Sequence, residues 1–272
     1  KKSGETINIK RQSPVLQPYN SGGEFYFNRG AGITIRKRKM ETTLFASSRK
    51  LDANVVLDTI NRRYYASSIL STGYHRTGNE NIDRNAIVQT AFGGNINYRG
   101  NGWRIAINSV CYHFSLPLQK RDEPYNLYTI RGRNWYNESI DYSYTFRNIH
   151  FFGEAAIDKN FNRAFINGLL ISADPRVELS FVQRAIAPAY QALYGNAFTE
   201  NTHPTNEAGF YAGIVIRPGT GLRVNAYADF FTFPWLRFQA DAPGTGTDLF
   251  IQFTYTPNRQ TELYSRFRNE RK

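Results

Sequence analysis

The side chains best suited to acid–base or metal chemistry at neutral pH are the histidines of this chain. They are His75, His113, His150 and His203. His75 and His203 lie in predicted loops, and Glu200 and Glu207 stand near the second of these. Zinc hydrolases use HExxH spacing, α/β-hydrolases use GxSxG, and nucleotide-binding proteins use GxxxxGKS/T or GxGxxG. None of these motifs occurs in the sequence.

We therefore predict that the protein is not an enzyme. The sequence assigns no catalytic residue, no cofactor-binding residue, no cofactor and no metal ligand. A site assembled from strand ends and loops would leave no short motif, so a hydrolase that uses His75 and His203 stays open as an alternative. A lone histidine in a loop is more often a solvated or capping residue than a catalytic one.

The composition excludes several classes of protein. Of the 272 residues, 41% are hydrophobic and 15% are aromatic, which is far more apolar surface than a disordered chain carries. No apolar run approaches the ~18 to 20 residues of a spanning helix, and the mean hydropathy is -0.52. The single cysteine, Cys111, excludes an internal disulfide and a cysteine-based zinc site.

The chain is strongly basic, with a net charge of +12. Such a surface can face nucleic acid, anionic lipid or an acidic substrate, and charge alone does not choose among them. No helix-turn-helix, KH loop or RRM motif is present, so the sequence argues against a nucleic acid partner.

Short alternating segments dominate the chain and predict strands, because successive side chains of a strand point to opposite faces. Residues 139–146, 208–217, 222–231 and 249–255 show this period most clearly. Leu222, Val224, Ala226, Leu249, Ile251 and Phe253 form the predicted lipid-facing set, and Arg223, Asn225, Asp229, Gln252 and Thr254 the opposite face. A soluble β-sandwich would turn the apolar face inward, and the sequence does not show which face points in.

Tight turns and longer connections alternate along the chain. Tight connections are expected near 37–39, 100–102, 147–148, 174–176, 218–221 and 257–259, and all but the first contain Gly, Pro, Asn or Asp, which favour turns. The longer connections span 49–90, 115–135, 158–163, 187–206 and 232–247, of which 158–163 is a short exception. In an up-and-down meander every second connection lies at the same end, so tight turns gather at one end and loops at the other.

This asymmetry is typical of outer-membrane barrels, which have short periplasmic turns and long extracellular loops. About twelve strands are visible, mostly of ~9–11 residues, the length that crosses a bilayer. The predicted fold class is therefore all-β, an antiparallel up-and-down transmembrane β-barrel. Aromatic clusters such as 230–235 suit the headgroup level of a bilayer. Basic residues crowd several strand ends, at 36–39, 62–63, 120–121, Arg131 and Arg133. On outward loops they would meet the phosphates of lipopolysaccharide.

Two regions divide the chain. Residues 1–31 alternate only weakly before Pro14 and Pro18, so we predict a lead-in or plug segment. Residues 32–272 are predicted to form the barrel, either complete or in large part. The chain begins with Lys1 rather than Met and without an apolar signal segment, so we expect a processed or partial piece of a longer protein.

One helix is expected inside the first long connection. A short helix is predicted at residues 82–92. Asn81 is its expected N-cap and Gly93-Gly94 its expected stop.

Several separated segments resemble a known family. They are residues 71–77 (STGYHRT), 92–96 (FGGNI), 194–198 (YGNAF) and 227–237 (YADFFTFPWLR). They look like the β-barrel region of Bacteroidota outer-membrane proteins whose precursors carry a periplasmic helix-hairpin-helix domain. The resemblance covers most of the chain after about Gly32 and implies a barrel in the outer membrane of a Gram-negative bacterium. No helix-hairpin-helix sequence is present, so no DNA-related role and no functional residue is carried over.

The expected function is that of a non-enzymatic subunit or scaffold of an envelope complex, in protein export or outer-membrane biogenesis. The expected partners are outer-membrane lipid, lipopolysaccharide and other proteins of that complex. Two further alternatives stay open beside the hydrolase. One is a pore for small solutes, and the other is a soluble basic β-sandwich that binds nucleic acid or glycan.

Overall fold

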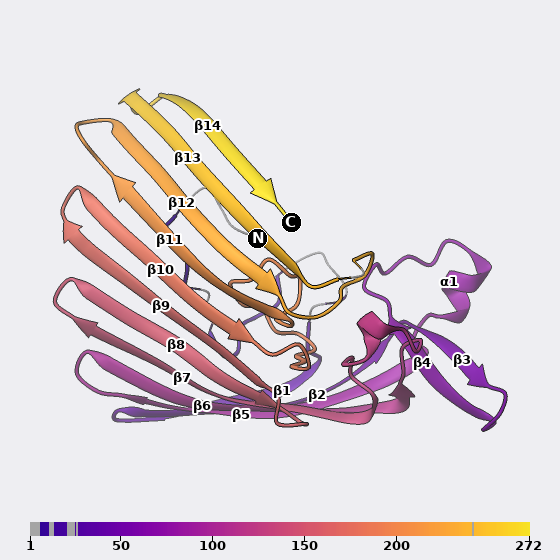
Figure 1. Cartoon of the computed structure of the whole chain (residues 1–272). Coiled ribbons are helices and arrows are strands. Elements are labelled where there is room, and N and C mark those ends of the chain that lie inside the picture. The colour runs from indigo at the N-terminus through magenta and orange to yellow at the C-terminus, as the bar shows by residue number, and fades with distance from the viewer. Residues whose placement is uncertain (1–5, 11–13, 21–24, 26, 241) are drawn as a thin grey trace.

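A computed structural model describes residues 6–10, 14–20, 25, 27–240 and 242–272, and strands make up nearly all of its regular structure (Figure 1). In this part of the chain, fourteen strands belong to one sheet, and twelve of them follow one another as an antiparallel meander. The predictions of an all-β fold and of an up-and-down antiparallel arrangement are thus confirmed.

The meander strands are β1 Gly30–Lys37, β2 Met40–Leu51, β5 Ile87–Arg99, β6 Trp103–Leu118, β7 Gly132–Phe146, β8 Ile149–Asp158, β9 Arg163–Asp174, β10 Val177–Ile186, β11 Glu207–Ile216, β12 Leu222–Phe233, β13 Gly244–Asn258 and β14 Thr261–Arg271. They pair in this order. Two further strands, β3 Ala53–Asp58 and β4 Arg63–Ile69, form a hairpin beside the meander. None of the helices among the described residues is long and apolar enough to cross a membrane.

Short and long connections separate to opposite ends of the meander (Figure 1). The tight-turn end carries the turns 38–39, 100–102, 147–148, 175–176, 217–221 and 259–260. The loop end carries the connections 52–86, 119–131, 159–162, 187–206 and 234–243. The alternation read from the turn residues therefore holds along the whole meander, including the short connection after β8.

The two faces of the sheet differ in the exposure of their side chains. Charged and amide side chains are buried on one face, where Asn225 is 3% exposed and Asp229 is 0% exposed. Apolar side chains are open on the other face, where Leu222 is 45% exposed. Residues 6–10 and the loop 187–206 cover the polar face through the contacts described below. We call that face concave and the other face convex.

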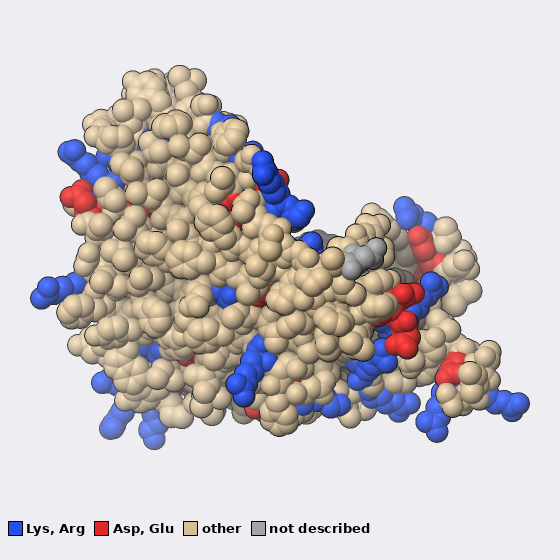
Figure 2. Space-filling model, in the orientation of Figure 1, with Lys and Arg blue, Asp and Glu red and all other residues tan. Residues whose placement is uncertain are grey.

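The predicted division of side chains between the two faces is confirmed. The register of β12 and β13 sets Val224 opposite Phe253 and Ala226 opposite Ile251, so the predicted lipid-facing residues share the convex face. Asn225 and Gln252 are opposite each other on the concave face. Figure 2 shows Lys and Arg side chains mainly along the margins of the molecule, with few across the broad visible surface.

The helix expected at 82–92 is wrong. Among the described residues the helices are α1 Gly78–Ile82, which lies upstream of this segment, and a one-turn 3-10 helix, η1 Pro124–Asn126, and the residues after 86 belong to β5. Thr77 and Glu80 form a reciprocal capping box at the start of α1, so the true N-cap lies four residues before Asn81.

Glycines 93 and 94 lie inside β5 and do not end a helix. At Gly93 the absence of a side chain leaves space for a neighbouring aromatic ring. A Cβ at Gly93 would lie 2.8 Å from the ring of Phe45, which stands directly opposite on β2. A glycine under an aromatic ring is a known device of curved sheets. The predicted 49–90 loop is also wrong in part, because it contains α1 and the β3–β4 hairpin.

The sheet is open. Among the described residues, β1 pairs only with β2, and β14 pairs only with β13. Figure 1 shows these two strands on separate edges of a strongly curved sheet. Of the predicted lead-in segment, residues 1–5, 11–13, 21–24 and 26 lie outside the described residues.

Candidate functional site on the concave face

A completely buried ion cluster occupies the concave face of β10, β11 and β12. Arg184 Nε donates to Glu207 Oε1 at 2.6 Å, and Arg184 Nη1 and Nη2 donate to the two carboxylate oxygens of Asp229 at 2.9 Å each. All three side chains are 0% exposed. The two-pronged contact with Asp229 is the strong form of an arginine–carboxylate pair, because two parallel hydrogen bonds fix its geometry.

The cluster continues to the edge strand β14. Asp229 stands directly opposite Asp248 of β13, and two opposed carboxylates repel each other. Arg268 of β14 offsets this repulsion, because its Nε and Nη2 donate to Asp248 at 3.0 and 2.9 Å. The Tyr227 hydroxyl donates to the same carboxylate at 3.1 Å. We call the whole series from Arg184 to Arg268 the ion ladder.

The loop 187–206 folds over the ion ladder and is tied to it by charge. The backbone N–H groups of Glu200 and Asn201 donate to the buried carboxylate of Glu207 at 3.0 Å. Lys272, just beyond β14, contacts the carboxylate of Glu200 at 3.1 Å. The carboxylate of Glu207 therefore holds both a strand cation and a loop backbone.

The start of the same loop is tied to β7. Trp135 Nε1 and Asn137 Nδ2 donate to the carbonyl oxygen of Gln191 at 3.1 and 2.8 Å. Tyr190 beside it is 5% exposed, and this burial raises the pKa of its hydroxyl. The loop thus crosses the concave face from β7 to β14 instead of extending into solvent.

Residues 6–10 lie on the concave face as well. The carbonyl oxygen of Thr6 accepts hydrogen bonds from Ser180 Oγ at 2.7 Å and from the Tyr211 hydroxyl at 2.9 Å. Ile9 is 3% exposed and belongs to a hydrophobic cluster with Val182 and residues of the inserted loop and strands. The N-terminal segment and the loop therefore share one small apolar core inside the curve of the sheet.

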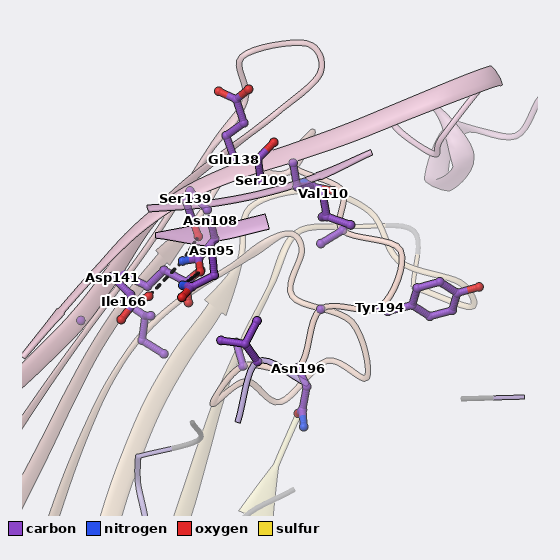
Figure 3. A pocket seen from close by; sticks show the side chains of 18 of the residues that line it. Asn95, Asn108, Ser109, Val110, Glu138, Ser139, Asp141, Ile166, Tyr194 and Asn196 are labelled. Carbon is purple, nitrogen blue, oxygen red and sulfur yellow. Dashed lines mark hydrogen bonds between the residues drawn. The ribbon is translucent and has the colours of Figure 1, made fainter. Parts of the chain in front are cut away.

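A cavity of about 480 Å³ lies between these inserted segments and the strands β5 to β9 (Figure 3). Figure 3 shows Asn95, Asn108 and Asp141 turned toward one another at its wall, whereas Glu138 points away. Arg104 Nη1 contacts Asp141 at 2.7 Å. The cavity is thus lined by polar groups from strands that are adjacent in the sheet.

The hydrogen bonds at this wall have a defined direction. The carboxylate of Asp141 can only accept, so Asn108 presents its Nδ2 to it, at 2.9 Å. Asn108 Oδ1 then faces Asn95 Nδ2, at 2.6 Å. Asn95 is 2% exposed, and among the described residues its Oδ1 has no hydrogen-bond partner. A buried acceptor without a donor costs about 1–3 kcal/mol, so this oxygen is a natural contact for water or a ligand hydroxyl.

The structure gives each histidine its own surroundings. His75 Nε2 contacts Asp52 Oδ2 at 2.8 Å, and His113 contacts Asn134. His150 contacts Lys10 and Thr145. His203 lies in the loop 187–206. Burial, together with the charge of Lys120, lowers the pKa of His203. Burial likewise lowers the pKa of Lys10. Glu207, predicted near His203, is buried against Arg184.

No metal site is evident in this part of the molecule. Among the described residues, no three His, Cys, Asp or Glu side chains gather closely enough to hold a metal ion. The sequence placed Asp229 on the polar face but did not identify Arg184 as its partner, because 45 residues separate them. The alternation of polar residues within each strand is the only sequence signal for such a cluster.

Comparison of the sequence with protein-family models and with curated proteins finds no match.

Proposed function

We propose that the sheet is the wall of a β-barrel in the outer membrane of a Gram-negative bacterium, and that the protein serves as a non-enzymatic subunit or scaffold of an envelope complex. The observation that carries this proposal is the inverted arrangement of the two faces. Burying ions such as Arg184 and Asp229 while leaving rows of apolar side chains open is unfavourable in water. It is the favourable arrangement for a wall with lipid on its convex side.

The convex face supplies enough apolar surface for this role. Its exposed large side chains include Ile33, Ile35, Leu44, Phe92, Ile96, Ile105, Ile107, Ile140, Phe151, Phe210, Phe230, Leu249 and Phe253. They come from strands across the whole meander, so they form a band and not a single patch. A monomer in water rarely exposes a continuous apolar area larger than a few hundred Å².

The two free edges must be covered in such a setting. In hydrocarbon, each N–H or C=O group without a hydrogen-bond partner costs roughly several kcal/mol. In the membrane, β1 and β14 therefore pair, either with each other or with further strands that complete a barrel.

A scaffold fits the concave face better than an open pore does. Residues 6–10 and the loop 187–206 occupy the space that a channel would need, and the ion ladder fastens the loop there. The resemblance to Bacteroidota outer-membrane proteins supports the same location. The long connections at the loop end other than 187–206 are then the surfaces available to partner proteins.

Cell fractionation followed by gel electrophoresis of the unboiled protein tests the proposal. We expect the protein in the outer-membrane fraction, with the unboiled form migrating faster than the boiled form. A protein that is soluble without detergent and shows no such shift would overturn the membrane assignment. The subunit role is tested separately by purification from native membranes in mild detergent, which should recover partners in fixed proportion; a lone monomer contradicts it.

A further inference from the structure

The tight-turn end carries a group of exposed cations that the concave face does not use. These are Lys37, Arg38, Lys39, Arg147, Arg176 and Arg259, and all of them are exposed. They lie at four of the six tight turns. Among the described residues, none of them forms an ion pair. We call this set the turn cations.

The acidic side chains at this end do not neutralise the turn cations. Glu41 is held by Arg36 and Arg99, at 3.9 Å from the second. Glu178 is held by Arg217 at 3.0 Å, and the carboxylate of Asp174 accepts the backbone N–H of Arg176 at 2.9 Å without pairing with its guanidinium. The arginines next to the two remaining tight turns therefore already have carboxylate partners, whereas the turn cations have none in the described part of the chain.

Exposed aromatic rings lie at the tight-turn end of the convex face. Trp103 follows the turn 100–102, and its ring lies 5.4 Å from that of Tyr98. Phe146 stacks near Tyr144, and the guanidinium of Arg147 lies 5.3 Å from the Phe146 ring. Trp and Tyr rings, which carry a polar group at one end, mark the headgroup level of a bilayer. The order from the strand centre to its end is thus apolar, aromatic and then cationic.

We propose that the turn cations bind the phosphates of anionic glycerophospholipids in the leaflet at the tight-turn end. This inference rests on the membrane location proposed above. It also replaces the expectation that residues 36–39 lie on outward loops and contact lipopolysaccharide, because they comprise the end of β1 and the tight turn 38–39 that leads into β2. Figures 1 and 2 together show basic side chains projecting from the margin where the tight turns lie.

The backbone at two of these turns allows a conservative test. Arg38 and Arg147 have φ values of 55° and 50°, in the left-handed region where asparagine is well tolerated. The double variant Arg38→Asn, Arg147→Asn therefore removes two charges and keeps the turns. Arg62 also has a φ of 50° and lies with Arg63 at the tip of the β3–β4 hairpin, away from the meander. Arg62→Asn, Arg63→Gln is the matched control.

The measurement is lipid retention by the full chain in nanodiscs of equal phosphatidylglycerol and phosphatidylcholine, read as bound lipid after transfer to detergent. We expect the protein to retain phosphatidylglycerol in preference to phosphatidylcholine. In the turn variant this preference should fall by up to about five-fold for each removed cation. The control should keep the preference. Equal retention by the turn variant and the wild type would overturn the inference, as would a loss confined to the control.

The same samples separate this inference from the membrane proposal. If the protein enters nanodiscs and is heat-modifiable but shows no lipid preference, only the lipid inference fails. If it does not associate with nanodiscs at all, the membrane proposal fails as well. Retention that persists unchanged in about 1 M salt, where the screening length falls to ~3 Å, would also contradict a charge-based contact.

Discussion

At the scale of single residues, Arg184 is the centre of the concave face. It satisfies Glu207 and Asp229 at once, and Glu207 in turn holds the backbone of the loop 187–206. Removing one partner of a buried ion pair is far more harmful than replacing the whole group by neutral residues, because the remaining charges keep their desolvation penalty.

We therefore expect Arg184→Met to destabilise the protein by about 3–5 kcal/mol. The temperature at which the fast-migrating form disappears from a gel, together with urea unfolding, measures the loss. The triple variant Arg184→Met, Glu207→Gln, Asp229→Asn should recover most of the stability.

The control is Arg217→Gln, which breaks a partly exposed pair with Glu178. It should change the free energy of unfolding by only about 0–1 kcal/mol. Equal effects of Arg184→Met and Arg217→Gln would show that the cluster is not buried in the protein.

At the scale of elements, the strands themselves could be predicted, because apolar and polar side chains alternate with period two in each segment. The identity of the inserted pieces could not. A helix is predicted from the sequence at 82–92, but residues 87–92 form a strand because they pair with residues 46–51 of β2, which are distant from them in sequence. The ion ladder could not be predicted either, because its members meet only through the register of neighbouring strands.

A matched pair of substitutions on β13 tests which face meets lipid. Ile251 lies on the convex face and Gln252 on the concave face, where its Oε1 accepts from Arg266 at 2.8 Å. We expect Ile251→Glu to reduce folding into lipid vesicles by up to about 2 kcal/mol, because a charge would enter hydrocarbon. Gln252→Glu should be tolerated, since it gains a cationic partner.

The opposite result would be informative. If the convex face met water, Ile251→Glu would be a surface change worth about 0.5 kcal/mol or less in either direction. A neutral outcome at Ile251 in vesicles would thus contradict the membrane wall, whatever the effect at Gln252.

At the scale of the whole molecule, the concave side of the curved sheet is partly filled. Residues 6–10 and the loop 187–206 meet in one hydrophobic cluster, and cavities of about 480 and 1300 Å³ remain beside them. If the proposed barrel closes around this content, the inserted segments obstruct its lumen.

Planar-bilayer recording tests this expectation. The wild type should pass no steady current, and a variant in which residues 191–203 are replaced by a short Gly-Ser linker should show discrete conductance steps. A variant with the same linker in place of residues 59–61, at the hairpin tip, should stay silent. Steady current through the wild type would favour the alternative of a pore for small solutes.

The order of the meander has a consequence for how such a protein can change over generations. Apart from the insertion between β2 and β5, each meander strand pairs with its neighbour in sequence. The β3–β4 hairpin was accommodated there without disturbing the pairing of β2 with β5. Duplication or loss of a gene segment that encodes one hairpin would add or remove two strands while leaving every other register intact. The number of strands can therefore drift in steps of two, and the width of the enclosed space can drift with it.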